Sequence, residues 1–134
     1  MLGAITAVAI VLLFGCGVTV PPDAESYDPP ASYRAVWDSA VACTGLHTRR
    51  FDELHFFVVP GQHSFWSHGE WAGGTTDGQG NITFSGDYQY HPMIVKHEMI
   101  HALGIDNHPH VPFEDPCHAT WASWHPADTV MLAP

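Results

Sequence analysis

The segment His97-Glu98-Met99-Ile100-His101 carries the clearest chemistry in the sequence. On a helix, two histidines four positions apart project from one face, one turn apart, where their imidazoles can bind a single Zn²⁺. Zinc lowers the pKa of a water molecule that it binds from about 15.7 to about 7, and a neighbouring carboxylate can then take the proton. The segment therefore predicts a zinc site at His97 and His101, with Glu98 as the general base.

The helix that would carry this motif is marked at both ends. Pro92 suits the first position of a helix, and Gly104 suits the residue that stops one. Between them the chain is apolar on nearly every helical face. We therefore expect a buried helix whose few polar side chains need partners.

Two segments carry a family resemblance. His97 to Gly104 reads HEMIHALG, and Thr129 to Pro134 reads TVMLAP. Together they resemble the metzincin metallopeptidases, most closely the matrixin-like group. In that family a glycine after the second histidine lets the chain reverse and return a third zinc ligand, and a methionine packs beneath the ligands. The resemblance implies Met131 as that methionine, Zn²⁺ as cofactor, and a zinc-dependent endopeptidase acting on peptide or protein substrates.

The third zinc ligand departs from the family spacing. The family places its third histidine three residues after the glycine, where this chain has Asn107, and His108 follows one residue later. We expect His108 to be the ligand, because one extra loop residue can be absorbed and an imidazole binds zinc far better than an amide. His110, Asp106 and Asn107 stay open as alternatives.

Patterns elsewhere predict the elements around the site. Apolar residues recur at helical spacing from Tyr33 to Val41, with Ser32 as a possible N-cap and Gly45 just past the end. Leu54 to Val59 is typical of a buried strand. Asn81 to Ser85 is typical of an edge strand or one arm of a hairpin.

The expected fold class is α+β. The resemblance implies a small zincin- or metzincin-like domain, a twisted mixed sheet with an N-terminal helix and the HExxH helix. Its edge strand, Ile82 to Ser85 in our assignment, would pair with extended substrate by β-augmentation. The glycine-rich segment from Gly69 to Gly80 is typical of turns and loops.

The N-terminus predicts a membrane anchor. Leu2 to Val20 contains no charged residue, and Leu13-Phe14-Gly15-Cys16 resembles a bacterial lipobox, in which the peptide is cut before a cysteine that is then acylated. This divides the chain into a signal peptide (1–15), a Pro-rich tether (16–30) and a metallopeptidase-like domain (31–134). An uncleaved transmembrane anchor is the alternative. Both place the domain outside the cytoplasm, on a bacterial membrane.

The chain has three cysteines, an odd number for a secreted protein. If Cys16 carries lipid, Cys43 and Cys117 are left to pair. Their bridge would tie the first helix to the segment after the histidines, closing a loop of about 75 residues. Two separate buried thiols are the alternative.

Composition limits the partners. The 134-residue chain has 14 acidic and 4 basic residues, a formal net charge of −10. Nucleic acid needs a basic surface, and the only fixed cations are Arg34, Arg49, Arg50 and Lys96. Nucleic acid is therefore not expected as a partner, whereas the acidic balance mildly favours cationic substrates. We expect a monomer.

The chain has 11 histidines, more than one site explains. His63 and His68, near Glu70, could form a second zinc or calcium site, although isolated surface or core positions explain them more simply. The histidine count keeps a second function open, that of a non-catalytic zinc-binding lipoprotein that stores or senses metal. A metallopeptidase fold without metal or activity is a third.

Overall fold

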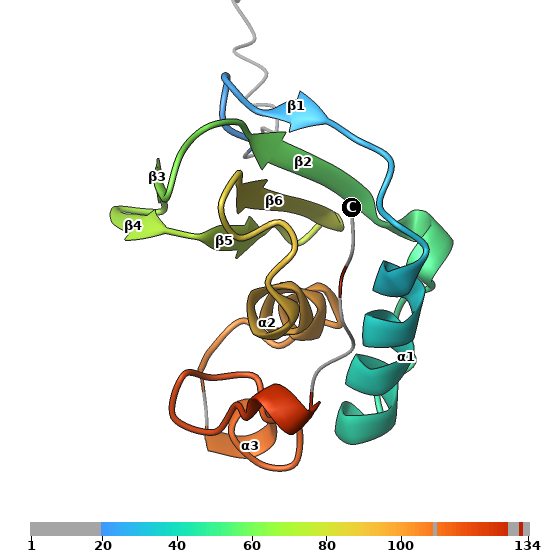
Figure 1. Cartoon of the computed structure of the whole chain (residues 1–134). Helices are drawn as coiled ribbons and strands as arrows, with labels where there is room; N and C mark the ends of the chain where they lie inside the picture. The colour runs from blue at the N-terminus through green and yellow to red at the C-terminus, as the bar shows by residue number, and fades with distance from the viewer. Residues whose placement is uncertain (1–19, 109, 129–131, 133–134) are drawn as a thin grey trace, which may run out of the picture.

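The computed structural model describes residues 20–108, 110–128 and 132. Figure 1 shows a sheet on one side of helix α2 and a loop segment on the other. Its strands are β1 (Glu25–Ser26), β2 (His55–Val59), β3 (Phe65–Ser67), β4 (Glu70–Ala72), β5 (Gly74–Thr76) and β6 (Asn81–Ser85). Its helices are α1 (Ser32–Thr44), α2 (Pro92–Ala102) and the short α3 (His110–Phe113), with 3-10 turns η1 (Phe51–Glu53) and η2 (Pro126–Asp128).

The main sheet is mixed, in the order β1-β2-β6-β5. β2 and β6 run parallel, with Phe56 opposite Ile82, while β1 and β5 are antiparallel to their neighbours. β3 and β4 form a separate two-stranded hairpin. The expected α+β class with a mixed sheet is confirmed.

Helix α1 follows the predicted apolar spacing. Tyr33, Val36, Trp37 and Ala40 are buried, and Gly45 closes the helix in the left-handed conformation (φ 69°) that glycine adopts without strain. The predicted N-cap was wrong by one residue. Ala31 holds that position without a capping side chain, and the helix already includes the expected cap.

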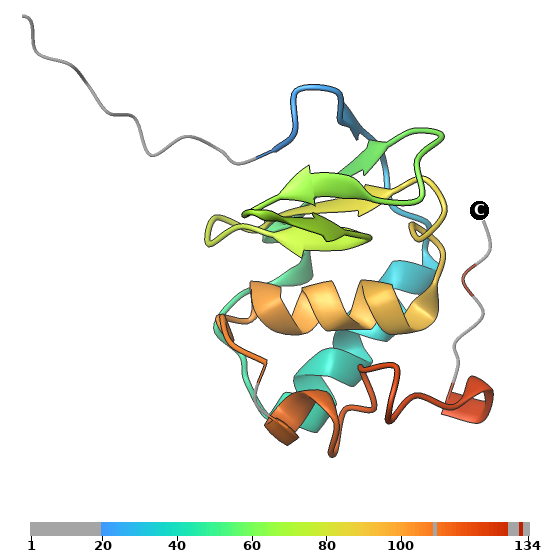
Figure 2. The ribbon, with the colours of Figure 1, turned by 90° about the vertical axis from the view of Figure 1, so that its left-hand side faces the viewer.

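Helix α2 begins at Pro92, as predicted, and runs beneath the sheet, between it and the α3 segment (Figure 2). Val95, Met99 and Ile100 are fully buried in a core shared with α1 and the sheet. The sheet on one side and the loop on the other explain why this helix is apolar nearly all round.

A disulfide joins Cys43 of α1 to Cys117, with a Cα–Cα distance of 5.2 Å. The predicted pairing is confirmed, and the alternative of two separate thiols was wrong. Cys117 is fully buried, and Phe113 and Ala119 on either side of it belong to the same core. The bridge therefore attaches the loop below α2 to the rest of the domain.

Three expectations about the sheet need correction. β6 lies between β2 and β5, so Ile82 to Ser85 is one arm of a hairpin and not an edge strand; β5 is the edge on that side of the sheet. The segment from Gly69 to Gly80, expected as loop, supplies β4 and β5. β1 lies inside the expected tether, so the sheet begins before Ala31.

Candidate metal centre

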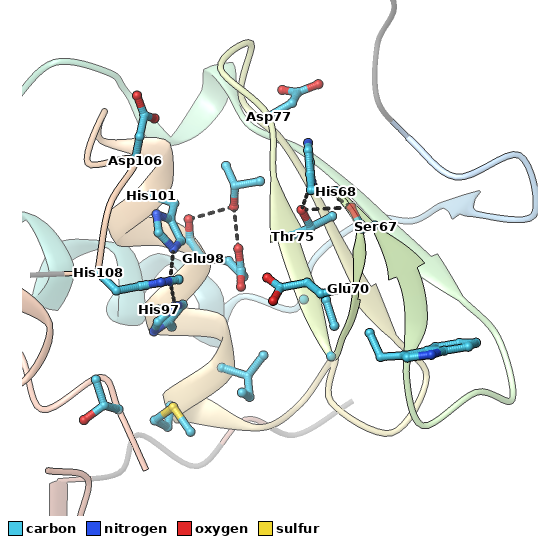
Figure 3. A pocket seen from close by; sticks show the side chains of 18 of the residues that line it. Ser67, His68, Glu70, Thr75, Asp77, His97, Glu98, His101, Asp106 and His108 are labelled. Atoms are coloured by element: carbon cyan, nitrogen blue, oxygen red, sulfur yellow. Dashed lines mark hydrogen bonds between the residues drawn. The ribbon is translucent and has the colours of Figure 1, made fainter. Parts of the chain in front are cut away.

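Three imidazoles meet beside α2. His97 and His101 project from the helix, and His108 reaches them from the following loop (Figure 3). The Nε2 atom of His108 lies 3.0 Å from the Nε2 atom of each of the other two. Zinc bonds of about 2.0–2.1 Å in tetrahedral geometry separate ligand atoms by about 3–3.5 Å. The three rings are therefore spaced as ligands of one metal ion.

Hydrogen bonds on the far side of two rings fix their tautomers. The Nδ1 atom of His97 lies 2.7 Å from the Ala119 carbonyl oxygen, and that of His101 lies 2.5 Å from the Ile105 carbonyl oxygen. A carbonyl only accepts, so each Nδ1 carries the proton and each Nε2 presents a lone pair. Lone pairs that converge at this distance fit a cation between them.

The protonation state suits metal binding as well. Burial lowers the pKa of His97 to about 4, helped by the neighbouring histidines and opposed by the bond to Ala119. Burial also lowers the pKa of His101. Both imidazoles are thus neutral at pH 7, the form in which histidine binds a metal.

An aromatic floor lies under the cluster. The ring of Phe113 is 4.7 Å from that of His97, 4.9 Å from that of His101 and 5.5 Å from that of His108, measured between centroids. Phe113 is 1% exposed, so the three histidine rings pack against a buried apolar side chain. Sequence reasoning assigned this role to Met131, which lies outside the described residues, and missed Phe113.

Glu98 is the buried carboxylate of the site, with 6% of its surface exposed. The Thr76 hydroxyl lies 2.8 Å from Oε2 of Glu98 and 3.0 Å from its backbone oxygen. Burial raises the pKa of Glu98 to about 7, although the bond from Thr76 opposes the shift. Glu98 can therefore take up and release a proton near neutral pH.

Strand β5 packs directly against this carboxylate. A Cβ atom at Gly74 would lie 2.8 Å from Cγ of Glu98, closer than real contacts allow. The glycine lets the strand approach the helix, and the hydroxyl two residues later bonds the carboxylate. No motif pointed to Thr76 or Gly74, because their role depends on how a hairpin sits over a helix.

A cleft of about 580 Å³ runs between α2 and the strands β4 and β5. The histidines and Glu98 form one wall, and residues 73–77, which include the edge strand β5, form the other. Glu70 extends into the cleft from β4 (Figure 3).

The remaining predicted site residues fall elsewhere. Asp106 and Asn107 are exposed, and Asp106 lies along the cleft outside the histidine cluster. The side chain of His110 and the whole of Cys16 lie outside the described residues.

The possible second metal site at His63, His68 and Glu70 does not form among the described residues, which agrees with the simpler interpretation of separate histidines. His63 contacts Asp87 and Tyr88, whereas His68 contacts Ser67 and Thr75. Among the described residues, one group of His, Cys, Asp or Glu side chains is placed closely enough to hold a metal ion. It consists of His97, His101 and His108.

Comparison with known proteins adds no relative. No family model matches the chain, and no curated protein or solved structure matches it significantly. A functional assignment therefore rests on the residues and geometry of this chain.

Proposed function

We propose that this protein is a zinc-dependent endopeptidase of the metzincin type, as the motif around His97 implies. One observation carries the proposal: three imidazoles converge beside a buried carboxylate, in a cleft bounded by an edge strand. His97, His101 and His108 are the metal ligands, and Glu98 is the general base. Met131 remains the proposed Met-turn residue.

The donor set supports zinc over harder cations. Three imidazole nitrogens suit zinc, whereas calcium and magnesium prefer oxygen ligands. Three protein ligands leave a fourth position open, which is typical of catalytic rather than structural zinc sites. When bound, zinc supplies Lewis acidity toward the peptide carbonyl and lowers the pKa of water.

Glu98 handles the proton in the proposed reaction. Its carboxylate accepts a proton from the attacking water and gives it to the amine as the peptide C–N bond breaks, leaving a carboxylic acid and an amine. The Thr76 hydroxyl, 2.8 Å from Oε2, holds the carboxylate in position. Glu98 is 6% exposed and lines the cleft, so its carboxylate can reach a ligand bound there.

In this proposal the edge strand β5 binds the substrate. Among the described residues, no strand pairs with β5 on the side away from β6, and residues 74–76 of β5 line the cleft together with Gly73. The unpaired backbone groups of such an edge bind an extended peptide by β-augmentation. In our proposal the peptide lies along β5, across the cleft from the histidines.

We also propose that the domain is a monomer anchored on the outer side of a bacterial membrane, through an acylated Cys16 after removal of residues 1–15. The Cys43–Cys117 bridge supports the location outside the cytoplasm, because disulfides persist in oxidising compartments. None of the helices in the described part of the chain is long and apolar enough to cross a bilayer.

The test is Glu98→Gln in the zinc-loaded protein. Removing the general base lowers the rate of hydrolysis of an unfolded protein substrate by at least about 100-fold, while zinc stays bound. The matched control is Asp38→Asn, on the exposed face of α1 and paired with Arg34. Cleavage and zinc content are measured on the same samples.

Unchanged cleavage by Glu98→Gln would contradict the mechanism. Wild-type protein that binds more than one zinc per chain and cleaves nothing would favour the non-catalytic zinc-binding lipoprotein instead.

A further inference from the structure

The connection between the proposed anchor and the folded domain is shorter than the expected tether of residues 16–30. The amide of Ala24 donates to the Pro21 carbonyl, β1 pairs with β2, and the amide of Tyr27 donates to the Phe56 carbonyl. Residues 25–27 therefore pair with the sheet, and a turn over residues 21–24 precedes them. Only residues 17–20 separate Cys16 from Pro21, a stretch whose full extension is at most about 18 Å. The surface around Pro21 is thus held close to the membrane.

That surface carries two exposed indoles. Trp66 on β3 and Trp71 on β4 are paired across the hairpin, with ring centroids 5.7 Å apart in an edge-to-face arrangement. They are 61% and 68% exposed, whereas Phe65 beside them is buried. Both line a shallow hollow that is also lined by Pro21 and Pro22. The exposed aromatic pair and the point where the chain enters the domain therefore share one face.

We propose that the Trp66–Trp71 hairpin rests in the headgroup region of the membrane that holds the anchor. Indole rings favour this region because they combine a large apolar body with a polar N–H group. The short connection brings the hairpin there without a further partner. This proposal depends on the proposed anchor and is independent of peptidase activity.

Charge identifies the kind of lipid surface. The hollow is lined by Asp23 and by no lysine or arginine, and Glu70 lies between the tryptophans in sequence. The chain as a whole carries a formal charge of −10. Attraction to anionic lipid therefore contributes nothing, and the indoles bind a zwitterionic surface.

The hairpin contact would also orient the cleft. Ser67, His68 and Trp71 line both the hollow and the cleft, so the docked hairpin is one wall of the cleft. The cleft then opens beside the bilayer. If the proposed peptidase function holds, the substrates are polypeptide segments close to the membrane surface.

The experiment uses the full-length lipidated chain in phosphatidylcholine vesicles whose acyl chains are brominated near the headgroups. Bromine quenches only those tryptophans that contact the lipid. The wild-type protein is quenched, and Trp66→Phe/Trp71→Phe loses most of that quenching. Trp121→Phe is the matched control, because Trp121 is 62% exposed but is not among the residues that line the hollow. This control variant keeps the quenching.

Four results would overturn the proposal. They are a chain that does not float with the vesicles, a floating chain that is not quenched, equal quenching in the double variant, and stronger quenching in phosphatidylglycerol vesicles. A second copy covering the tryptophans would instead shift their emission with protein concentration and leave it unquenched. The same measurement on Glu98→Gln separates this proposal from the peptidase, because inactive protein must be quenched equally.

Discussion

Helix α2 and the loop that follows it, residues 103–120, each build half of the metal centre, and they do so by different means. The helix places His97, Glu98 and His101 by its period alone. The loop contributes His108, the Phe113 floor and the carbonyl groups that fix the two helical histidines.

The loop needs support that the helix does not. Thr48 donates to the Leu103 carbonyl at its start, and the disulfide holds Cys117 near its end. The amide of Ala119 donates to the Phe113 carbonyl at 2.7 Å, which closes the loop under the histidines. A helix can therefore supply two ligands from local structure, whereas the third ligand and the orientation of His97 depend on the loop and its support.

The largest expected effect tests whether the two halves contribute equally. His101→Ala on the helix and His108→Ala on the loop each remove one of three ligands, so both should lose bound zinc on dialysis. Elemental analysis of the dialysed protein measures this. His63→Ala, outside the cluster, should keep its zinc. Retention of zinc by His108→Ala would return Asp106, Asn107 and His110 as candidates.

The next largest effect tests the support of the loop. Cys43→Ser/Cys117→Ser frees a long loop in the unfolded chain and should lower the free energy of unfolding by about 4 kcal/mol, measured by urea denaturation. It should also weaken zinc binding about tenfold, because Ala119 and Phe113 lose their anchor. Competition with a chromophoric chelator measures that affinity.

Ala35→Ser, an exposed change on the same helix as Cys43, is the control for the disulfide variant. Zinc binding equal to that of the wild type in the disulfide variant would show that the loop keeps its place without the bridge.

The smallest expected effect distinguishes two contributions of Phe113 under the histidines, its apolar packing and its aromatic ring. Phe113→Leu keeps a buried apolar side chain under the histidines and should cost about 1 kcal/mol of unfolding free energy. Zinc affinity should stay close to that of the wild type. A large loss of affinity would mean that the aromatic ring itself positions the imidazoles.

The helices were predictable from sequence because their signals are local. Pro92 starts α2, Gly45 ends α1, and the apolar spacing from Tyr33 selects the buried face. The Ser32 cap failed because such residues also suit the first turn of a helix, and α1 begins one residue earlier than the cap signal indicates.

The glycine-rich strand was not predictable. Glycine is unfavourable in strands when a sequence is read alone. Gly74 is nevertheless in β5, because a side chain there would collide with Glu98. β6 was mistaken for an edge strand for the same reason, because its neighbour β5 was predicted as loop.

The residues of the site also divide into those that could be predicted from the sequence and those that could not. His97, Glu98 and His101 follow from the motif, and His108 from the resemblance and zinc chemistry. Phe113, Thr76 and the carbonyl groups of Ile105 and Ala119 carry no signal in their residue types. They are set by tertiary packing of the loop and of β5 against α2.

X-ray absorption spectroscopy of the zinc-loaded wild-type protein tests the central claim most directly, because it identifies the ligands without relying on activity. Our account predicts one zinc per chain with three imidazole nitrogens at about 2.0–2.1 Å. Two imidazoles only, or a sulfur ligand at about 2.3 Å, would contradict a centre shared by the helix and the loop.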